Sequence, residues 1–180
     1  TLYSTLKQLA TEQVNVCTIE DPIEMIEPAF NQMQVNPGVD LHFADGIRSL
    51  MRQDPDIIMV GEIRDAETAN MAVQASLTGH LVLSTLHTND APSSITRLHD
   101  LGVQPFLTSA TILGVMAQRL LRTLCPHCKQ AVDVTADSEI AIQWQELVQP
   151  WRAPVPAQVY KAQGCEHCRH TGYQGRVGLY

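Results

Sequence analysis

The stretch that decides the fold is residues 54–91, DPDIIMVGEIRDAETANMAVQASLTGHLVLSTLHTNDA. Within it, the apolar run Ile57–Val60 predicts a buried strand, and the run that begins at Leu81 predicts a second one. The residues between them, 66–77, carry a narrow face of small side chains and predict a helix that packs closely on a sheet. Strand, helix and strand in this order predict an open α/β sheet, which binds ligands at the carboxyl ends of its strands.

The remainder of the first two thirds of the chain continues this alternation of helices and strands. Asp65 is the expected N-cap of the helix at 66–77. Hydrophobic periodicity and turn residues together predict a helix over 1–12, a strand over 14–19, a hairpin or edge strand over 30–36, a helix over 43–53, a strand over 56–60, the helix over 66–77, a strand over 81–86, a helix from Asn89 or Asp90 to Gly102, and a core helix over 106–122.

Composition limits the classes of protein that fit this chain. Its 180 residues suffice for one domain with a small appendage, and an apolar fraction of 44% suffices for a packed core. The formal net charge of −7 argues against direct binding of nucleic acid, which needs a basic surface. No apolar run approaches the ~18 residues of a transmembrane segment, and no signal peptide is recognisable. The sequence starts at Thr1 without an initiator methionine, so we expect a piece of a longer protein.

The character of the sequence changes at Cys125, where we place a boundary between domains 1–124 and 125–180. The second domain carries two Cys-x-x-Cys pairs, formed by Cys125, Cys128, Cys165 and Cys168. Four thiolates are the tetrahedral ligand set of a structural Zn²⁺, and we expect them to bind one zinc ion. The alternatives are two disulfides or one redox-active pair, although neither pair follows a strand in a βαβ unit as a thioredoxin-like pair does. A helix is expected over 137–148 in this domain.

Two groups of carboxylates follow predicted strands. Glu20, Asp21 and Glu24 come directly after the strand at 14–19, and Glu62 follows the next apolar strand and a glycine. Carboxylates at the end of a strand suit Mg²⁺ binding and water activation. In P-loop ATPases an acid at the second position holds the water shell of Mg²⁺ or polarises the attacking water. A polar turn at the first position and a helix-capping glutamate at the second are the alternatives.

Histidines and arginines complete the set of candidate site residues. His80 precedes the second strand of the deciding stretch and His87 follows it, so His87 lies at the end where ligands bind. Arg48 and Arg52 are four residues apart and share one face of a predicted helix. Arginines near subunit boundaries of ring ATPases stabilise the transferring phosphate, so these two and Arg64 are candidates for that role. A solvated basic face is the alternative for them.

Three blocks of sequence resemble the secretion ATPases, the family that powers type II secretion and type IV pilus assembly. CTIEDPIE at 17–24 is similar to the aspartate box of that family, RQDPDIIMVGEIRD at 52–65 to its Walker B region, and TGHLVLSTLHT at 78–88 to its histidine box. The cysteine pattern is similar to the four-cysteine subdomain that many members carry. The resemblance extends over the whole of residues 1–180.

This resemblance implies an α/β fold with a partial RecA-like P-loop NTPase core and a small C-terminal four-cysteine, zinc-binding subdomain. It implies that Glu24 orients or deprotonates the attacking water, and that Glu20 and Asp21 support it and the water shell of the metal. His87 aligns with the histidine that senses the terminal phosphate, and His80 belongs to the same box as a nucleotide-binding candidate. ATP and Mg²⁺ are the implied ligands of the whole protein.

The Walker A motif, Gly-x-x-x-x-Gly-Lys-[Ser/Thr], does not occur in the 180 residues. TLYSTL at 1–6 resembles the helix that directly follows this loop in the family, so we expect the loop to precede Thr1 in the whole protein. Because the loop holds the phosphates, residues 1–180 alone are expected to hydrolyse ATP poorly.

By resemblance, the whole protein is expected to be a cytoplasmic homohexamer that hydrolyses ATP to ADP and phosphate. It is expected to have no transmembrane segment and to associate with the inner membrane through a membrane platform and the cytoplasmic-face components of a secretion or pilus machine. Two other functions remain open. One is a non-catalytic zinc-binding module that docks partner proteins, and the other is a motor that serves DNA uptake through a pilus.

Overall fold

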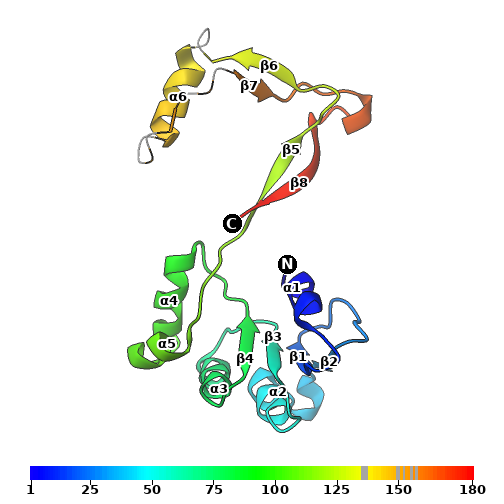
Figure 1. The fold of residues 1–180 in the computed structure, drawn as a ribbon, viewed down its shortest axis with the longest axis vertical. Coiled ribbons are helices and arrows are strands. Elements are labelled where there is room, and N and C mark those ends of the chain that lie inside the picture. The colour runs from blue at the N-terminus through cyan, green and yellow to red at the C-terminus, as the bar shows by residue number, and fades with distance from the viewer. Residues whose placement is uncertain (135–137, 149–150, 152, 155, 157) are drawn as a thin grey trace. The chain divides into compact units, whose positions relative to one another are not determined.

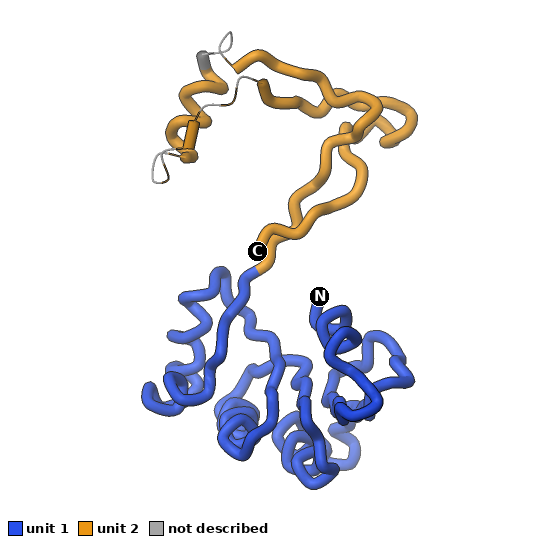
Figure 2. Tube along the Cα trace, in the orientation of Figure 1, with its two compact units in different colours: residues 1–117 blue, residues 118–180 orange. Residues whose placement is uncertain are grey.

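Strand β1 (Val16–Glu20) is the buried centre of the first part of the chain in the computed structural model (Figure 1). The structure describes residues 1–134, 138–148, 151, 153–154, 156 and 158–180. These form two compact units, the first unit Thr1–Ala117 and the second unit Gln118–Tyr180 (Figure 2). Among the described residues, every helix is too short or too polar to span a lipid bilayer.

The sheet of the first unit is entirely parallel, as the strand–helix–strand pattern predicts. Its described strands follow the order β2-β1-β3-β4 and are β2 (Asn31–Gln34), β1, β3 (Ile57–Val60) and β4 (Leu81–Ser84). All four strands therefore end at the same edge of the sheet. The segment expected over 30–36 contributes the edge strand β2, and the hairpin alternative is wrong because β2 runs parallel to β1.

Helices cover both faces of this sheet, and alternate residues of each strand point to opposite sides. Helix α1 (Leu2–Leu9) packs on one face, where Leu6 lies against the odd-numbered pair Ile57 and Met59 of β3. Helices α2 (Phe43–Leu50) and α3 (Ala66–Leu77) pack on the other face, in one cluster with Ile58 and Val60 of β3. The α/β fold expected from the sequence is thus confirmed. The short helix η1 (Pro37–Val39) connects β2 to α2.

The starts of the helices obey the capping rules. Asp65 accepts a hydrogen bond from the backbone N–H of Thr68 and is the N-cap of α3, as expected. Asp90 does the same for Ser93 at the start of α4 (Ala91–Asp100), where Pro92 occupies the first turn. These caps fix where α3 and α4 begin, directly after the loops that follow β3 and β4.

The core helix expected over 106–122 is wrong. Helix α5 (Pro105–Thr111) ends after seven residues, and Ile112 already has an extended backbone. Residues 119–124 form a strand, β5 (Arg119–Leu124), because they pair with β8 (Tyr173–Leu179) more than fifty residues later. Periodicity along 106–122 cannot detect a partner so distant in the sequence.

The described residues of the second unit form two antiparallel ribbons, one α-helix and the short helix η3 (Glu166–Cys168). One ribbon is β5·β8. The other is formed by β6 (Gln130–Asp133) and β7 (Gln158–Lys161), and helix α6 (Ser138–Val148) lies between these two strands in the sequence. The division between units falls after Ala117, whereas the change in sequence character predicts it after residue 124. The intervening residues include β5, which belongs to the second unit through its pairing with β8. Residue 137, the expected first residue of α6, lies outside the described residues.

Candidate functional site

The carboxyl edge of the parallel sheet opens into a cavity of about 340 Å³. The ends of β1, β3 and β4 all contribute to it, because parallel strands finish at a common edge. Six of the predicted site residues line this cavity: Glu20, Asp21, Glu24, Glu62, Arg64 and His87. Leu2, Tyr3, Pro22, Phe43, Met59, Gly61 and Thr85 complete its lining.

Glu62 is the electrostatic centre of the cavity. Arg64 donates from Nε to Oε2 of Glu62 over 2.6 Å, and Nε2 of His87 lies 3.0 Å from the same oxygen. The Glu62 side chain is 12% exposed, whereas those of Arg64 and His87 are 68% and 76% exposed. A mostly buried carboxylate with two exposed donors in front of it can exchange those donors for a metal ion or its bound water, and leave the donors to bind a phosphate oxygen.

Glu20 differs from the other carboxylates because it is buried and accepts three hydrogen bonds from side chains. It is the last residue of β1 rather than the residue after the strand, and it is 3% exposed. Its carboxylate accepts hydrogen bonds from the hydroxyls of Tyr3 and Thr18 and from the amide of Gln32. Burial and the hydrogen bond to Glu20 raise the pKa of Tyr3 to about 12, so its phenol stays a donor at neutral pH.

Asp21 and Glu24 lie on the connection between β1 and β2, and both side chains are exposed and face the cavity. Their oxygens are the type of ligand that Mg²⁺ prefers, and exposed carboxylates are free to accept a proton from water. With Glu62, they give the cavity three carboxylates of different burial around one space. The chemistry of this donor set fits a magnesium-bound polyphosphate.

Three candidates from the sequence lie away from the cavity. His80 is at the amino end of β4, where its Nδ1 lies 2.8 Å from the carbonyl oxygen of Ala75 at the end of α3. Arg48 forms ion pairs with Asp45 and Glu67 on the surface of α2 and α3. Arg52 is exposed just after α2. Within one chain, His80 therefore contacts a carbonyl group at the C-terminal end of α3, and Arg48 links α2 to α3 by ion pairs.

Some cavity residues were not predicted from the sequence. Tyr3 reaches the cavity from α1, and Thr85 donates to the carbonyl oxygen of Gly61 over 2.7 Å, joining the ends of β4 and β3. Thr85 could have been found, since it follows the same strand as His87. Tyr3 and Gln32 could not, because their roles depend on contacts with Glu20 across 17 and 12 residues of sequence.

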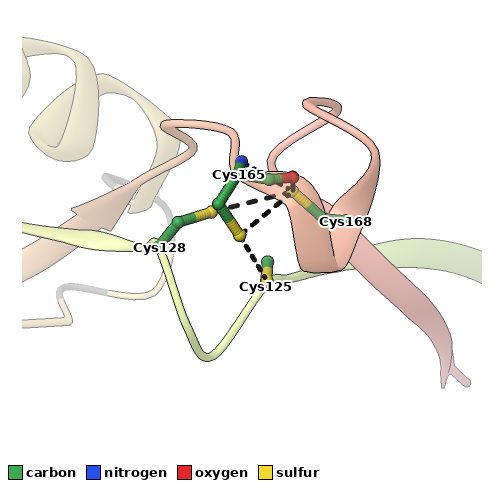
Figure 3. Close-up of side chains that lie close together, drawn as sticks. All are labelled: Cys125, Cys128, Cys165 and Cys168. Carbon is green, nitrogen blue, oxygen red and sulfur yellow. Dashed lines mark hydrogen bonds between the residues drawn. The ribbon is translucent and has the colours of Figure 1, made fainter.

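The four cysteines of the second unit converge on one point (Figure 3). Cys125 and Cys128 lie between β5 and β6, and Cys165 and Cys168 lie around η3 (Glu166–Cys168), before β8. Their sulfur atoms are all within 4.8 Å of one another, with separations of 3.8 Å between Cys128 and Cys168 and 4.0 Å between Cys125 and Cys165. Four sulfurs bound to one Zn²⁺ at about 2.3 Å are about 3.8 Å apart.

This geometry separates the three readings of the cysteine pattern. A disulfide requires sulfurs at about 2.05 Å, so the disulfide alternative does not fit, and all five cysteines are free thiols. Both pairs also occupy loops between antiparallel strands, not the end of a strand in a βαβ unit. The cluster can hold a metal ion.

Backbone donors surround the same sulfurs. Burial alone would raise the pKa of Cys168, but the N–H groups of Cys165 and Gly172 donate to its sulfur and lower that pKa to about 6. Burial raises the pKa of Cys128 to about 12, against a hydrogen bond from the N–H of Gly164. The polypeptide thus stabilises the thiolate of Cys168 before any metal binds, whereas burial favours the protonated thiol of Cys128.

Comparison with known proteins gives matches along the whole chain. The family model described as Type II/IV secretion system protein matches residues 1–180. The type IV pilus assembly ATPase TfpB of Acinetobacter baylyi is 72% identical over 180 residues, which are 100% of this chain and 30% of that protein. The type II secretion system ATPase E of Vibrio cholerae is 53% identical over 180 residues, 100% of this chain and 34% of that protein. The chain therefore spans about a third of the length of these relatives.

Solved structures agree with these matches. The crystal structure of the pilus retraction motor PilT with bound ADP aligns with a TM-score of 0.60 at 30% identity, covering 83% of this chain and 49% of that one. The ATPase DotB of Legionella pneumophila aligns with a TM-score of 0.52 at 34% identity, covering 69% of this chain and 37% of that one.

Proposed function

The chain belongs to the type II/IV secretion system protein family, and we propose that it is the C-terminal part of the ATPase domain of a motor that drives type IV pilus assembly. One observation carries this proposal: Glu24, Glu62 and His87 line one cavity at the carboxyl edge of a parallel sheet. The names of the relatives support ATP hydrolysis as the reaction, since TfpB and the Vibrio protein are both ATPases.

Pilus assembly is favoured over type II protein secretion by sequence identity. The chain is 72% identical to the pilus assembly ATPase TfpB, and 53% and 52% identical to the type II secretion proteins E of Vibrio cholerae and Aeromonas hydrophila. A motor for a pilus that takes up DNA belongs to the same proposal, because it would act on the fibre and not on DNA.

The proposed reaction is attack of water on the γ-phosphorus of ATP, which forms one P–O bond, breaks the bond to the β,γ-bridging oxygen and releases ADP. Glu24 takes the proton of the attacking water, because its exposed carboxylate faces the cavity. Glu62, Asp21 and the phosphates would hold Mg²⁺, which neutralises charge that develops on the phosphate oxygens. His87 and Arg64 leave Glu62 and donate to the γ-phosphate.

We further propose that Cys125, Cys128, Cys165 and Cys168 bind one structural Zn²⁺. The sulfur separations of 3.8 to 4.0 Å support tetrahedral coordination. The small core supports a structural role, because among the described residues of the second unit only Cys125, Val134 and Cys168 are buried apolar side chains. A unit with so small a hydrophobic core needs a further stabilising feature, such as a bound metal ion, in order to fold.

The assembly proposed for the whole protein is a homohexamer in the cytoplasm, attached to the inner membrane through a membrane platform and the cytoplasmic components of the pilus machine. The support is family membership together with the names of the relatives, which describe pilus assembly and secretion motors. Arg48 and Arg52 are exposed on the first unit and are available to a neighbouring subunit's phosphates.

The experiment is phosphate release from Mg-ATP by the purified whole protein and its variants. Glu62→Gln and Glu24→Gln should each remove most of the activity, since each substitution keeps the size of the side chain and removes its charge. Glu12→Gln, an exposed glutamate outside the cavity, is the matched control. Wild-type turnover in both cavity variants would contradict the proposed reaction. Counting surface pili and secreted protein in a deletion strain separates pilus assembly from secretion.

A further inference from the structure

The connection between β1 and β2, residues 21–30, forms one wall of the cavity and carries Glu24. It contains no helix or strand, and Asp21, Pro22 and Glu24 line the cavity from it. A catalytic carboxylate on irregular backbone must be held by other contacts, because a displacement of about 1 Å can cost 100-fold in rate. The residues that hold this connection are therefore of functional interest.

Gln32 on β2 makes two of these contacts. Its Nε2 donates to the carbonyl oxygen of Met25 over 3.0 Å, and its Oε1 accepts from the backbone N–H of Glu27 over 2.7 Å. The same Nε2 lies 3.2 Å from Oε1 of Glu20 and 3.0 Å from the hydroxyl oxygen of Tyr3. A single side-chain amide thus ties the connection to β1 and to α1.

Glu20 and Tyr3 anchor that amide. The Glu20 carboxylate is 3% exposed and accepts hydrogen bonds from Tyr3, Thr18 and Gln32. Three donors from three different elements hold this carboxylate in one orientation, so it is a fixed acceptor for the Gln32 amide. It holds the Gln32 amide in the orientation that presents its oxygen to Glu27.

The connection is pinned on both sides of Glu24. Before it, the backbone N–H of Ile23 donates to Oε1 of Gln34 over 3.2 Å. After it, Met25 and Glu27 are bonded to Gln32, and the Glu27 carboxylate pairs with Lys7 of α1. The backbone of Glu24 is therefore held at its neighbours, while its side chain stays exposed and faces the cavity.

We propose that Gln32, anchored by Tyr3 and Glu20, is a positioning residue that holds the Glu24 carboxylate in place for water attack on ATP. The inference rests on the proposed function, because it names what orients the base of that reaction. Gln32 touches no reacting atom. It acts by restricting the backbone around Glu24 before ATP binds. The ordering of this backbone therefore adds nothing to the activation free energy of the reaction.

The test is steady-state hydrolysis of Mg-ATP by the whole protein carrying Gln32→Met, which keeps the length of the side chain and removes its amide. We expect kcat to fall by about 10- to 100-fold. KM should stay within about threefold, because ground-state binding of ATP does not use Glu24. Gln74→Met, on the exposed face of α3, is the matched control and should keep the wild-type kcat.

A double-mutant cycle separates positioning from general damage. In a Glu24→Gln background, Gln32→Met should change the residual rate by less than about twofold, because the group that it positions has been lost. An equal loss in both backgrounds, or wild-type kcat in Gln32→Met alongside an inactive Glu24→Gln, would overturn the inference and leave the proposed function standing. Wild-type turnover in Glu24→Gln itself would overturn the proposed reaction.

Tyr3→Phe provides the same test with a smaller perturbation, in case Gln32→Met does not fold. It removes one hydroxyl that donates to Glu20 and accepts from Gln32. We expect kcat to fall by about 10-fold with KM nearly unchanged. An unchanged kcat in a folded Tyr3→Phe protein would contradict the anchoring of Gln32.

Discussion

The Nε2 atom of His87 lies 3.0 Å from Oε2 of Glu62, so the ends of two neighbouring parallel strands are joined through one carboxylate. Arg64 donates to the same oxygen over 2.6 Å. Two donors on one oxygen form a compact arrangement, and both donors are more than two thirds exposed. In the proposed reaction, a phosphate that enters the cavity can therefore draw His87 and Arg64 away from Glu62. The buried area of these two side chains changes little, because both are already exposed.

The first prediction concerns His87. In the whole protein, His87→Ala should lower kcat by ~10²-fold, or about 2.7 kcal/mol, since one donor to the developing charge is lost. KM for ATP should change much less, because most nucleotide contacts are made by other residues. Phosphate-release assays over a range of ATP concentrations measure both quantities.

His80→Ala is the matched control, because it makes the same substitution at the other end of β4. His80 Nδ1 lies 2.8 Å from the carbonyl oxygen of Ala75, so its loss should cost about 1 kcal/mol of stability while kcat stays near the wild-type value. A large loss of kcat in His80→Ala with normal turnover in His87→Ala would reverse the assignment of the two histidines.

The second prediction concerns zinc. The whole protein should contain one Zn²⁺ per chain, and Cys165→Ser should lose it, because the cluster needs four thiolates. Cys17→Ser is the control, since Cys17 is a buried thiol of the first unit and should leave the zinc content unchanged. Elemental analysis of the purified proteins measures this. Zinc-free wild-type protein with disulfides would contradict it.

Acid should release the metal. A thiol must lose its proton to bind zinc, so the affinity of the cluster for zinc falls as the pH drops. Backbone donors lower the pKa of Cys168 to about 6, so this sulfur keeps its charge to a lower pH than an ordinary thiol. The second unit should lose its structure together with the zinc, because little apolar surface holds it otherwise. Circular dichroism and zinc release, followed together during acid titration, should show a single transition.

Much of the first unit could be predicted from sequence because its signals are local. The run Ile57–Val60 is apolar at every position, since β3 is buried on both faces, and Asp65 caps α3 with its own side chain. Glu62 and His87 follow such strands directly, so a parallel sheet is enough to bring them to one edge. The spacing of the two Cys-x-x-Cys pairs likewise predicts a cluster of four cysteines that could hold a metal ion, which the structure has.

The predictions that were wrong concern residues whose structure depends on partners far away in the sequence. The segment 119–124 is a strand only because β8 pairs with it, and its Leu120 and Leu121 are exposed, so their spacing says nothing about a core. Glu20 looked like a free carboxylate in a turn. It is buried because Tyr3 and Gln32 meet it from α1 and β2, which no local pattern encodes.

The last prediction concerns packing beneath the cavity, at Gly46 of α2. A Cβ atom at Gly46 would lie 2.7 Å from Cδ1 and Cγ1 of Ile19, a residue of β1 that is fully buried. Helix propensity favours Gly46→Ala by about 1 kcal/mol, whereas overpacking a buried contact costs about 1–3 kcal/mol. Because the side chain of Ile19 is fully buried where β1 packs on α2 and cannot move freely, we expect the clash to dominate and the protein to be destabilised.

Gly114→Ala is the control for this substitution, since a Cβ atom there meets nothing within 4 Å. It should change the stability by less than about 0.5 kcal/mol. Denaturant unfolding of the whole protein, followed by a probe in the first unit, measures both variants. If Gly46→Ala is as stable as Gly114→Ala, helix α2 can move away from β1, and their packing is looser than the contact between Gly46 and Ile19 implies.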